Sequence, residues 1–497
     1  MKMIKFFVAC LLFVNILEAQ SKNIFWKRDF WKTKPSIELV EQKITEGNSP
    51  TILNKHGFDA VVYAILEKAP NKTIKHLLDK KGNNVNKLTH DKRTYVFWAA
   101  YKNNVDLMKY LIAKKAKMNL RDSHRFSVLT FAAAAGVQNR AIYDLCIENG
   151  IDIKTDIDEH GANALLLIAP SLNDTKLLDY LVSKGIAFNS VDANGNGIFD
   201  YAAKKGNKTM MQKLISLGAL FKVPTTDGAN AMIFASRGTR SNTNSLETFK
   251  YLESLGISPN SITKQGFTPL HALSFKNKDV SIFEYFIEKG VDVNQQDENG
   301  NTAFLNAVYR NDLKVVKYLS QYITDINTRN KDGKSALMIA LSKNSVETVE
   351  FLIEKGANIN HKDEKGNTLS YYLLDAFKAE NQDVFNKKRA ALESVGFHIP
   401  DTQAGANTLY HLAVQKNDLE LLKKLTVYEI PVNAKNDEGI TALHLAAMKA
   451  KDAGILKFLI AQGADKTIET NFDETVFSLA TENELLQKTN IDFLLNH

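Results

Sequence analysis

Cysteine is nearly absent from this sequence, which limits how the fold can be held together. Among 497 residues there are two cysteines and nine prolines. Cys10 lies in an N-terminal segment that we expect to be removed, so Cys146 has no partner for an intrachain disulfide. Cys146 falls in the apolar stretch 142–147, where a small buried hydrophobic role is expected. The fold must therefore be stabilised by packing rather than by disulfides.

Motifs of known catalytic and metal centres are also missing. The sequence holds no Gly-x-Ser-x-Gly, no Walker loop, no His-Glu-x-x-His and no paired cysteines. Its eleven histidines are scattered. Aspartates and glutamates recur in loops, where turn chemistry explains them and calcium binding is the alternative. We predict that the protein is not an enzyme and needs no cofactor or metal.

Charge of one sign is not concentrated anywhere along the chain. The net charge is +7, and basic and acidic residues are interspersed along the predicted helices, as on solvated surfaces. A dedicated nucleic-acid-binding protein would show dense basic clusters. We therefore expect no nucleic-acid partner.

Long apolar runs are limited to the N-terminus. Lys2 and Lys5 precede an apolar run over 6–17, and Ala19 follows it. The run is shorter than the roughly 20 residues that a membrane span needs. We predict a secretory signal peptide over 1–19, cleaved after Ala19, and hence a periplasmic or secreted protein without a membrane span. Lipoprotein processing at Cys10 is the alternative.

The chain contains a short sequence motif, which we call the phrase, that recurs about every 33 residues. Its clearest copies are residues 439–447 (Gly-Ile-Thr-Ala-Leu-His-Leu-Ala-Ala) and 266–272 (Gly-Phe-Thr-Pro-Leu-His-Ala). A second glycine closes most units ten residues before the next copy begins. The first residue of each copy, which we call the anchor, is Gly57, Lys92, Arg125, Gly161, Gly195, Gly228, Gly266, Gly300, Gly333, Gly366, Ala406, Gly439 or Asp473.

Each unit has the pattern of two short helices followed by a loop. The first helix carries the small residues of the phrase. The second carries apolar residues at helical spacing, as over 346–353. One such helix pair cannot bury its apolar face alone, so neighbouring units must stack into a continuous core.

The unit length, Thr-Pro-Leu-His at 268–271 and the unit ending at 356–360 resemble the ankyrin repeat family. The resemblance covers roughly 54–497. It implies an all-α solenoid of about 13 helix-turn-helix units joined by hairpin loops. It also implies that the histidine of the phrase bonds loop backbone between units, which concerns His271, His411 and His444. Lys92, Arg125, Ala406 and Asp473 depart from the family's anchor glycine.

The two ends of the stack should be capped. Residues 20–53 form an N-terminal segment in which Ser36 to Gly47 has the pattern of a lone capping helix. Trp26, Phe30 and Trp31 are expected to fold back onto this cap. The repeats proper then occupy 54–470, and 471–497 form a C-terminal capping repeat.

A candidate partner-binding strip lies near the end of the first helix, nine or ten residues after the anchors. In ankyrin stacks this part of the helix faces a concave groove. Cations there could serve only to cap the helix, because its C-terminus carries partial negative charge. Capping does not explain the aromatic residues, which favour an added recognition role. The candidate residues are Tyr101, Lys102, Lys205, Arg237, Phe275, Lys276, Tyr309, Arg310, Lys343, Lys416 and Lys449.

We therefore predict a monomeric, non-enzymatic scaffold that presents a basic, aromatic groove to a partner protein with an acidic surface. The alternatives are a periplasmic protective or assembly factor, or inhibitor, for a neighbouring secreted enzyme or toxin, and a host-directed effector. Two units carry insertions, at 238–245 and 377–388. Such insertions either lie near a binding face or are tolerated loop changes.

Overall fold

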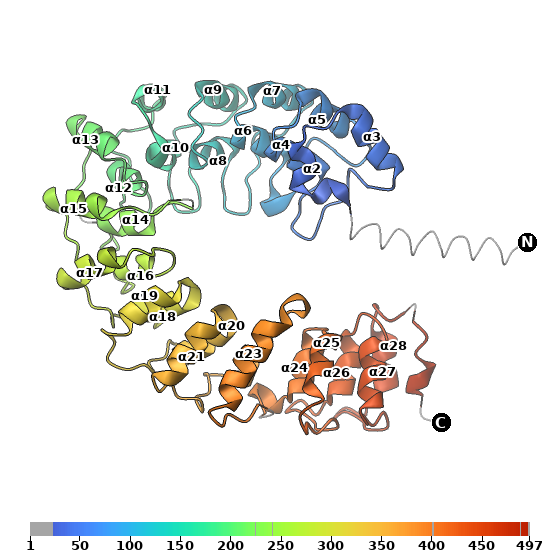
Figure 1. Cartoon of the computed structure of the whole chain (residues 1–497). Helices are drawn as coiled ribbons and strands as arrows, with labels where there is room; N and C mark the ends of the chain where they lie inside the picture. The colour runs from blue at the N-terminus through green and yellow to red at the C-terminus, as the bar shows by residue number, and fades with distance from the viewer. Residues whose placement is uncertain (1–22, 224, 241, 400–401, 488, 496–497) are drawn as a thin grey trace, which may run out of the picture. The chain divides into compact units, whose positions relative to one another are not determined.

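The computed structural model describes residues 23–223, 225–240, 242–399, 402–487 and 489–495, so the predicted signal peptide lies outside the described residues. This part of the chain is helical, and its only β-pairing consists of three isolated bridges. The chain divides into two compact units, Met1–Ser258 and Pro259–His497. Figure 1 shows successive helix pairs joined by loops in each unit. The predicted all-α class is confirmed.

The first unit opens with η1 (Ile24–Trp26), α2 (Arg28–Lys32) and α3 (Ile37–Thr45). Six helix pairs follow, and we call the first member of each pair the inner helix. The pairs are α4 (Ala60–Leu66) with α5 (Asn71–Leu78), α6 (Tyr95–Tyr101) with α7 (Val105–Ala113), α8 (Val128–Ala134) with α9 (Arg140–Glu148), α10 (Ala164–Ile168) with α11 (Lys176–Ser183), α12 (Ile198–Ala203) with α13 (Lys208–Ser216), and α14 (Ala231–Arg237) with α15 (Leu246–Ser254).

The second unit continues the same pattern and ends with one inner helix, α28 (Val476–Glu482), and η6 (Asp492–Leu494). Its pairs are α16 (Pro269–Leu273) with α17 (Val280–Glu288), α18 (Ala303–Arg310) with α19 (Leu313–Leu319), α20 (Ala336–Lys343) with α21 (Val346–Glu354), α22 (Leu369–Asp375) with α23 (Gln382–Glu393), α24 (Leu409–Gln415) with α25 (Leu419–Leu425), and α26 (Ala442–Lys449) with α27 (Gly454–Ala461).

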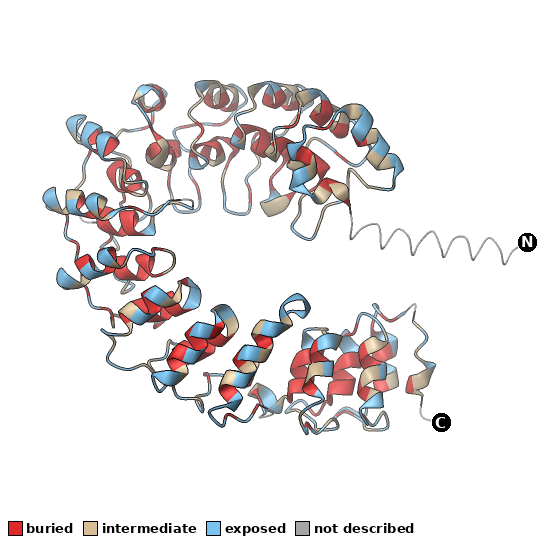
Figure 2. Ribbon diagram, viewed as in Figure 1, coloured by how far each residue is buried: buried red, intermediate tan, exposed pale blue. Residues whose placement is uncertain are grey.

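The inner helices form the core of each unit. In α26 every residue of 442–447 is buried, because the helix is covered by α24, α27 and α28. The second helices are buried on one side only, as Figure 2 shows. A hydroxyl residue starts most inner helices: Thr441 and Ser335 accept hydrogen bonds from the third helical N–H group of α26 and α20.

All thirteen anchors adopt positive φ, and they lie at the tips of the hairpin loops. Glycine is required at Gly300 and Gly333, where an added Cβ would lie 2.7 Å and 2.6 Å from backbone nitrogens of the next hairpin. The four anchors that are not glycine keep the same left-handed conformation, with φ between 54° and 61°. The anchors therefore keep one backbone conformation even where glycine is replaced. Each of the four replacements lowers the stability of the fold by about 1–2 kcal/mol relative to glycine.

The phrase histidines bond loop backbone between neighbouring units. The Nε2 atoms of His271, His411 and His444 lie 3.0, 3.0 and 2.8 Å from backbone carbonyl oxygens of the following hairpin. A carbonyl only accepts, so Nε2 donates, and Nδ1 accepts the N–H of Thr268, Thr408 or Thr441. The interpretation of these residues as structural links is confirmed.

The N-terminal segment before the first repeat contains a capped helix and buried aromatic side chains. Ser36 starts α3 by accepting the N–H of Leu39. Trp31 is fully buried and donates its indole N–H to the carbonyl of Phe25, while the Trp26 indole donates to the carbonyl of Ile52. These aromatic residues lie against the first repeat rather than in solvent.

Candidate functional site

The predicted strip residues all lie at the C-terminal ends of inner helices. Lys102 and Lys416 are C-caps of α6 and α24, and Lys205 and Lys276 lie just beyond α12 and α16. The other cations are the last residues of their helices: Arg237, Arg310, Lys343 and Lys449. Helix capping and partner recognition both predict this placement, so it does not distinguish between the two roles.

In the second unit, three strip residues line one groove. Phe275, Tyr309 and Lys343 border a hollow of about 550 Å³ on the side of α18, α20 and α22 where their hairpins project. Tyr309 is 45 % exposed, and its ring meets that of Phe275 edge-on with centroids 6.4 Å apart. Such a pair of rings, held by packing at one side and open at the other, can bury a partner's apolar side chain.

The floor and far wall of this groove come from residues that the repeat pattern did not single out. Asn306 and Ile339, on α18 and α20, lie at the base. Tyr371 and Tyr372, at the start of α22, add two further rings at 5.3 Å from one another. Both tyrosines follow the place where clear copies of the repeated motif have Thr-x-Leu, and Tyr371 stands at the position of the motif's histidine. This departure from the motif could have identified the two tyrosines from the sequence.

Charge in this groove is balanced. Asp375, at the end of α22, places Oδ2 3.2 Å from Nζ of Lys343 and Oδ1 3.8 Å from Nζ of Lys416. Lys416 also donates to the Asp375 backbone carbonyl at 2.9 Å. These groups are exposed, so each pair contributes at most about 1 kcal/mol to stability. Two of the predicted cations therefore share one acidic neighbour.

Asp363 is held by its own hairpin. Its carboxylate accepts the Tyr372 hydroxyl at 2.6 Å and the backbone N–H groups of Lys365 and Asn367 at 2.9 and 2.8 Å. Burial alone would raise the pKa of Asp363, but these hydrogen bonds outweigh it and the pKa lies below its ordinary value. Asp363 therefore stabilises the turn of its own hairpin, as the sequence predicted for the aspartates of these loops.

In the first unit, Tyr101 belongs to an aromatic cluster on the inner helices. Its ring stacks on Phe131 with centroids 5.5 Å apart, and Trp98 meets both rings edge-on. The guanidinium of Arg93 lies 4.3 Å from the Phe131 centroid and pairs with Asp122 at 2.7 Å. Trp98 and Phe131 stand six residues after their anchors, one turn before Tyr101's position, and this shared offset could have identified them from sequence.

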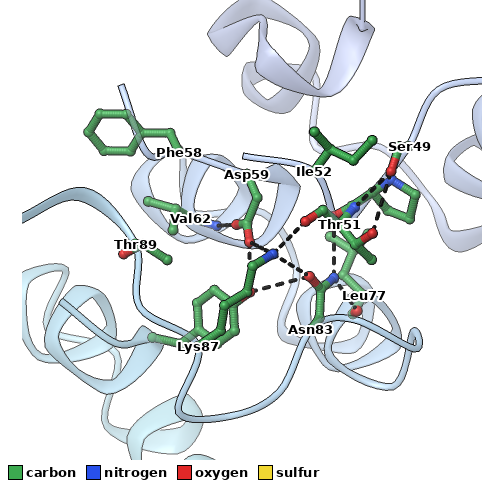
Figure 3. Close-up of polar contacts among 12 residues, drawn as sticks. Ser49, Thr51, Ile52, Phe58, Asp59, Val62, Leu77, Asn83, Lys87 and Thr89 are labelled. Carbon is green, nitrogen blue, oxygen red and sulfur yellow. Dashed lines mark hydrogen bonds and ion pairs between the residues drawn. The ribbon is translucent and has the colours of Figure 1, made fainter. Parts of the chain in front are cut away.

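A buried ion pair of the first two repeats is structural. Figure 3 shows the ammonium of Lys87 between Asp59, Asn83 and the Thr51 carbonyl. Asp59 is fully buried, accepts the Tyr95 hydroxyl at 2.7 Å and caps α4 through the N–H of Val62. Every polar group in the cluster has a partner within it, so it braces the first two repeats and offers no open position for a substrate.

Both insertions end in side chains that tie neighbouring repeats together. Asn244, at the end of the 238–245 loop, donates to the carbonyls of Ala203 and Ala235 at 3.2 and 2.8 Å. The 377–388 insertion lengthens α23 to 12 residues. There Lys388 is buried and its ammonium donates to the carbonyls of Ala340 and Leu341 at 3.1 and 2.8 Å, and to that of Asn344. Neither of these contacts between repeats could be predicted from the sequence pattern.

Three further features of the structure concern metal binding, membrane crossing and the cysteine. Across the described ranges, no group of three or more His, Cys, Asp or Glu side chains is arranged to hold a metal ion. No helix in the described part of the chain is both long and apolar enough to cross a bilayer. Cys146 is buried, and burial raises the pKa of its thiol.

Comparison with known proteins agrees with the architecture. The family model described as ankyrin repeats (3 copies) matches residues 33–122, 61–157, 96–192, 199–297, 270–363 and 404–497. The chain belongs to the ankyrin repeat family. The stretch 364–403, which holds the enlarged α22–α23 unit, lies between two of these matches.

Two curated proteins are similar to parts of the chain. A palmitoyltransferase, AKR1, of Lachancea kluyveri is 27 % identical over 276 residues, which is 54 % of this chain and 30 % of that protein. An L-asparaginase of Dirofilaria immitis is 30 % identical over 161 residues, 32 % of this chain and 26 % of that protein. The chain thus spans less than a third of the length of either relative.

Proposed function

We propose that the protein is a non-enzymatic scaffold that binds a partner protein in the groove of its second unit, with Phe275 and Tyr309 as the main anchors. The edge-on pair of these rings beside a hollow of about 550 Å³ carries the proposal. Ankyrin repeats serve protein–protein interaction, and a rigid, pre-formed groove binds without a large ordering cost.

The chemistry of the groove favours an apolar or aromatic side chain from the partner, flanked by polar backbone. Amides of Asn301 and Asn306 and the rings of Tyr309 and Tyr371 line the hollow together. Asp375 offsets Lys343 and Lys416, and Asp332 and Glu364 line the groove beside the hairpin lysines Lys331 and Lys365, so attraction to an acidic partner rests mainly on Arg310 at the end of α18. Charge then governs the rate of encounter, and the rings govern affinity.

Export by the predicted signal peptide over 1–19 places this interaction in the periplasm or outside the cell. The partner is then either an exported protein of the same cell or a host protein. A role in protecting or inhibiting a secreted enzyme or toxin, or in binding a host protein, would use the same groove. The fraction from which the partner is captured distinguishes these roles.

The test is affinity capture from periplasmic and secreted fractions with matched baits. One bait carries Phe275→Ala with Tyr309→Ala, and the control bait carries Tyr322→Ala, an exposed tyrosine of the same unit in the turn after α19. A partner kept by the native and control baits but lost from the double variant supports the proposal. Equal retention by all three baits contradicts it.

A further inference from the structure

The unit of α12 and α13 departs from the phrase at two positions that line the same hollow. It has Gly197 and Asp200 where the clear copies of the phrase have threonine and histidine. Gly197 therefore starts α12 without a side-chain cap. Apart from its chain neighbours, a Cβ added to Gly197 would meet no atom nearer than the Leu220 carbonyl oxygen at 3.8 Å. The space that a threonine side chain would fill is open in this unit.

Asp200 borders two hollows that share part of their lining. The larger hollow has a volume of about 430 Å³ and the smaller one of about 40 Å³. Phe221 and Val223, in the loop after α13, line both hollows together with Asp200. All lining residues of the two hollows belong to the first unit. We call the two hollows together the Asp200 site.

The walls of the Asp200 site carry aliphatic side chains that are open to solvent. Val191, Leu220 and Val223 are 52 %, 55 % and 55 % exposed. Beside them, the ring of Phe221 lies against that of buried Phe199, with centroids 5.3 Å apart. Single exposed aliphatic side chains are ordinary on a protein surface, but a group of them around one hollow favours a ligand with an apolar part.

The carboxylate of this site has no cation beside it. Asp200 is 8 % exposed and accepts the N–H of Gly197 at 2.9 Å. Burial, and to a lesser degree the charge of Asp192, raise its pKa to about 7, and no lysine or arginine of the described residues offsets them. Lys222 borders the larger hollow, but its ammonium lies over the ring of Phe221, 5.4 Å from the centroid. An ionised carboxylate in this setting is destabilised until a cation reaches it.

Helix capping does not require this charge. The neutral amide of an asparagine would accept the Gly197 N–H as well as a carboxylate does, and burying it would cost less free energy. The Asp200 site therefore combines a buried carboxylate with apolar walls, and it lacks the positive charge that would complete it.

We propose that the Asp200 site binds a primary ammonium group carried on an aliphatic chain. The ammonium pairs with the carboxylate of Asp200 through a charge-assisted hydrogen bond. The aliphatic chain covers the side chains of Val191, Leu220 and Val223, and the removal of this apolar surface from water adds affinity. The ammonium belongs either to a free alkylamine or to a lysine side chain of a bound polypeptide.

This proposal does not rest on the groove of the second unit, because the Asp200 site lies in the first. The Phe275→Ala, Tyr309→Ala double variant should therefore bind the ammonium ligand like the native chain. Asp179, an exposed carboxylate on α11 of the first unit, provides the matched control for the loss of one negative charge.

The experiment follows the fluorescence anisotropy of dansylcadaverine, a labelled pentylammonium, with the full-length chain. Unlabelled n-pentylammonium, methylammonium and 1-pentanol compete with it. We expect n-pentylammonium to bind at least about tenfold more tightly than pentanol, which lacks the charge, and than methylammonium, which lacks the chain. The affinity for n-pentylammonium should rise about tenfold from pH 6 to pH 8, because Asp200, with a pKa of about 7, ionises over this range while the amine stays charged.

Substitutions then assign the effect to Asp200. Asp200→Asn should weaken binding at least about tenfold and remove its dependence on pH, whereas Asp179→Asn should bind like the native chain. Gly197→Thr with Asp200→His restores the residues of the phrase, fills the open space and should abolish binding. Circular dichroism and melting curves check that each variant is folded.

Two further competitors, peptides that differ only in a central lysine or norleucine, distinguish the sources of the ammonium. Stronger competition by the lysine peptide than by n-pentylammonium supports the site and identifies a lysine side chain, whereas equal or weaker competition identifies a free alkylamine. Three results overturn the site: equal competition by n-pentylammonium and pentanol, an unchanged affinity between pH 6 and pH 8, or equal losses in Asp200→Asn and Asp179→Asn.

Discussion

The ends of the inner helices carry cations in both units, yet the two units use them differently. In the second unit Lys343 and Lys416 share the carboxylate of Asp375, whereas Lys388, on the second helix α23, is buried against three carbonyl oxygens of a neighbouring repeat. In the first unit Lys204 lies over aromatic rings without a carboxylate at ion-pair distance among the described residues. A lysine that recurs near one position of the repeat therefore has no single function. Its role depends on the groups that it contacts on the neighbouring repeats.

The largest expected effect separates a cation that is hydrogen-bonded to backbone from a cation that lies over aromatic rings. Lys388→Met should leave the carbonyls of Ala340, Leu341 and Asn344 without their donor and lower the free energy of unfolding of the second unit by about 2–3 kcal/mol. Lys204→Met should leave the stability of the first unit unchanged or higher, because it removes a partly desolvated charge. Urea unfolding of both variants measures the difference. Similar losses in both would remove the distinction.

Binding in the second unit should depend on rings more than on charge. Phe275→Ala with Tyr309→Ala is expected to weaken partner binding by about 2 kcal/mol or more, because the two rings form the exposed wall of the groove. The melting temperature should change little for Tyr309→Ala, since that ring is already 45 % exposed. Calorimetry with the captured partner gives the affinity, and a thermal scan gives the stability. A loss of stability as large as the loss of affinity would contradict a recognition role.

The two units should respond to acid in opposite directions. Burial lowers the pKa values of His271, His411 and His444, so the unfolded chain binds protons more readily than the folded one and the second unit loses stability as pH falls through 6.5. Burial raises the pKa of Asp200, in α12 of the first unit, to about 7. The folded first unit then binds the extra proton between about pH 4 and 7, and that contribution grows as pH falls.

Hydrogen exchange resolved to peptides from α12–α14 and from α24–α26, at pH 5.5 and 7.5 and corrected for intrinsic rates, measures this contrast. Protection should fall at the lower pH in the second unit and hold or rise in the first. Asp200→Asn should remove the rise in the first unit without altering the second. Parallel changes in both segments would show that the buried groups do not set the pH response.

A smaller effect concerns the anchors. Ala406 adopts φ of 54°, so Ala406→Gly should raise stability by about 1 kcal/mol. The reverse change, Gly439→Ala, places a Cβ 2.2 Å from the side chain of Asn471 at a φ of 75° and should destabilise by more than that amount. Chemical denaturation of the two variants tests both signs. Equal and negligible changes would mean that the hairpin backbone adjusts freely.

The smallest expected effect concerns the exposed ion pairs of the second unit. Asp375→Asn removes the carboxylate shared by Lys343 and Lys416, and it should alter the free energy of unfolding by less than about 1 kcal/mol because the pairs are exposed. Urea unfolding of this variant beside Lys388→Met measures the contrast. A loss as large as that of Lys388→Met would contradict it.

The sequence predicted the positions of the repeats well, because these follow one another at a nearly constant spacing along the chain. The spacing of the phrase located all thirteen hairpin tips, and the histidine positions were correctly interpreted as links between units. Asp375 and Lys388 were missed as partners of neighbouring repeats, since the Lys343 and Asp375 carboxylate pair is separated by 32 residues and depends on side-chain reach. The aromatic setting of Lys204 likewise arises only when α12 and α14 lie side by side.

The central claim is that a partner protein lies in the groove of the second unit, and site-specific photocrosslinking tests it most directly. A benzophenone amino acid replaces Tyr309 in one variant and Tyr322 in another, and each is irradiated in the exported fraction of the source cells. Our account predicts a discrete crosslinked product at position 309, mapped to one protein, and none at position 322. Products of the same protein at both positions, or at 322 alone, would contradict it.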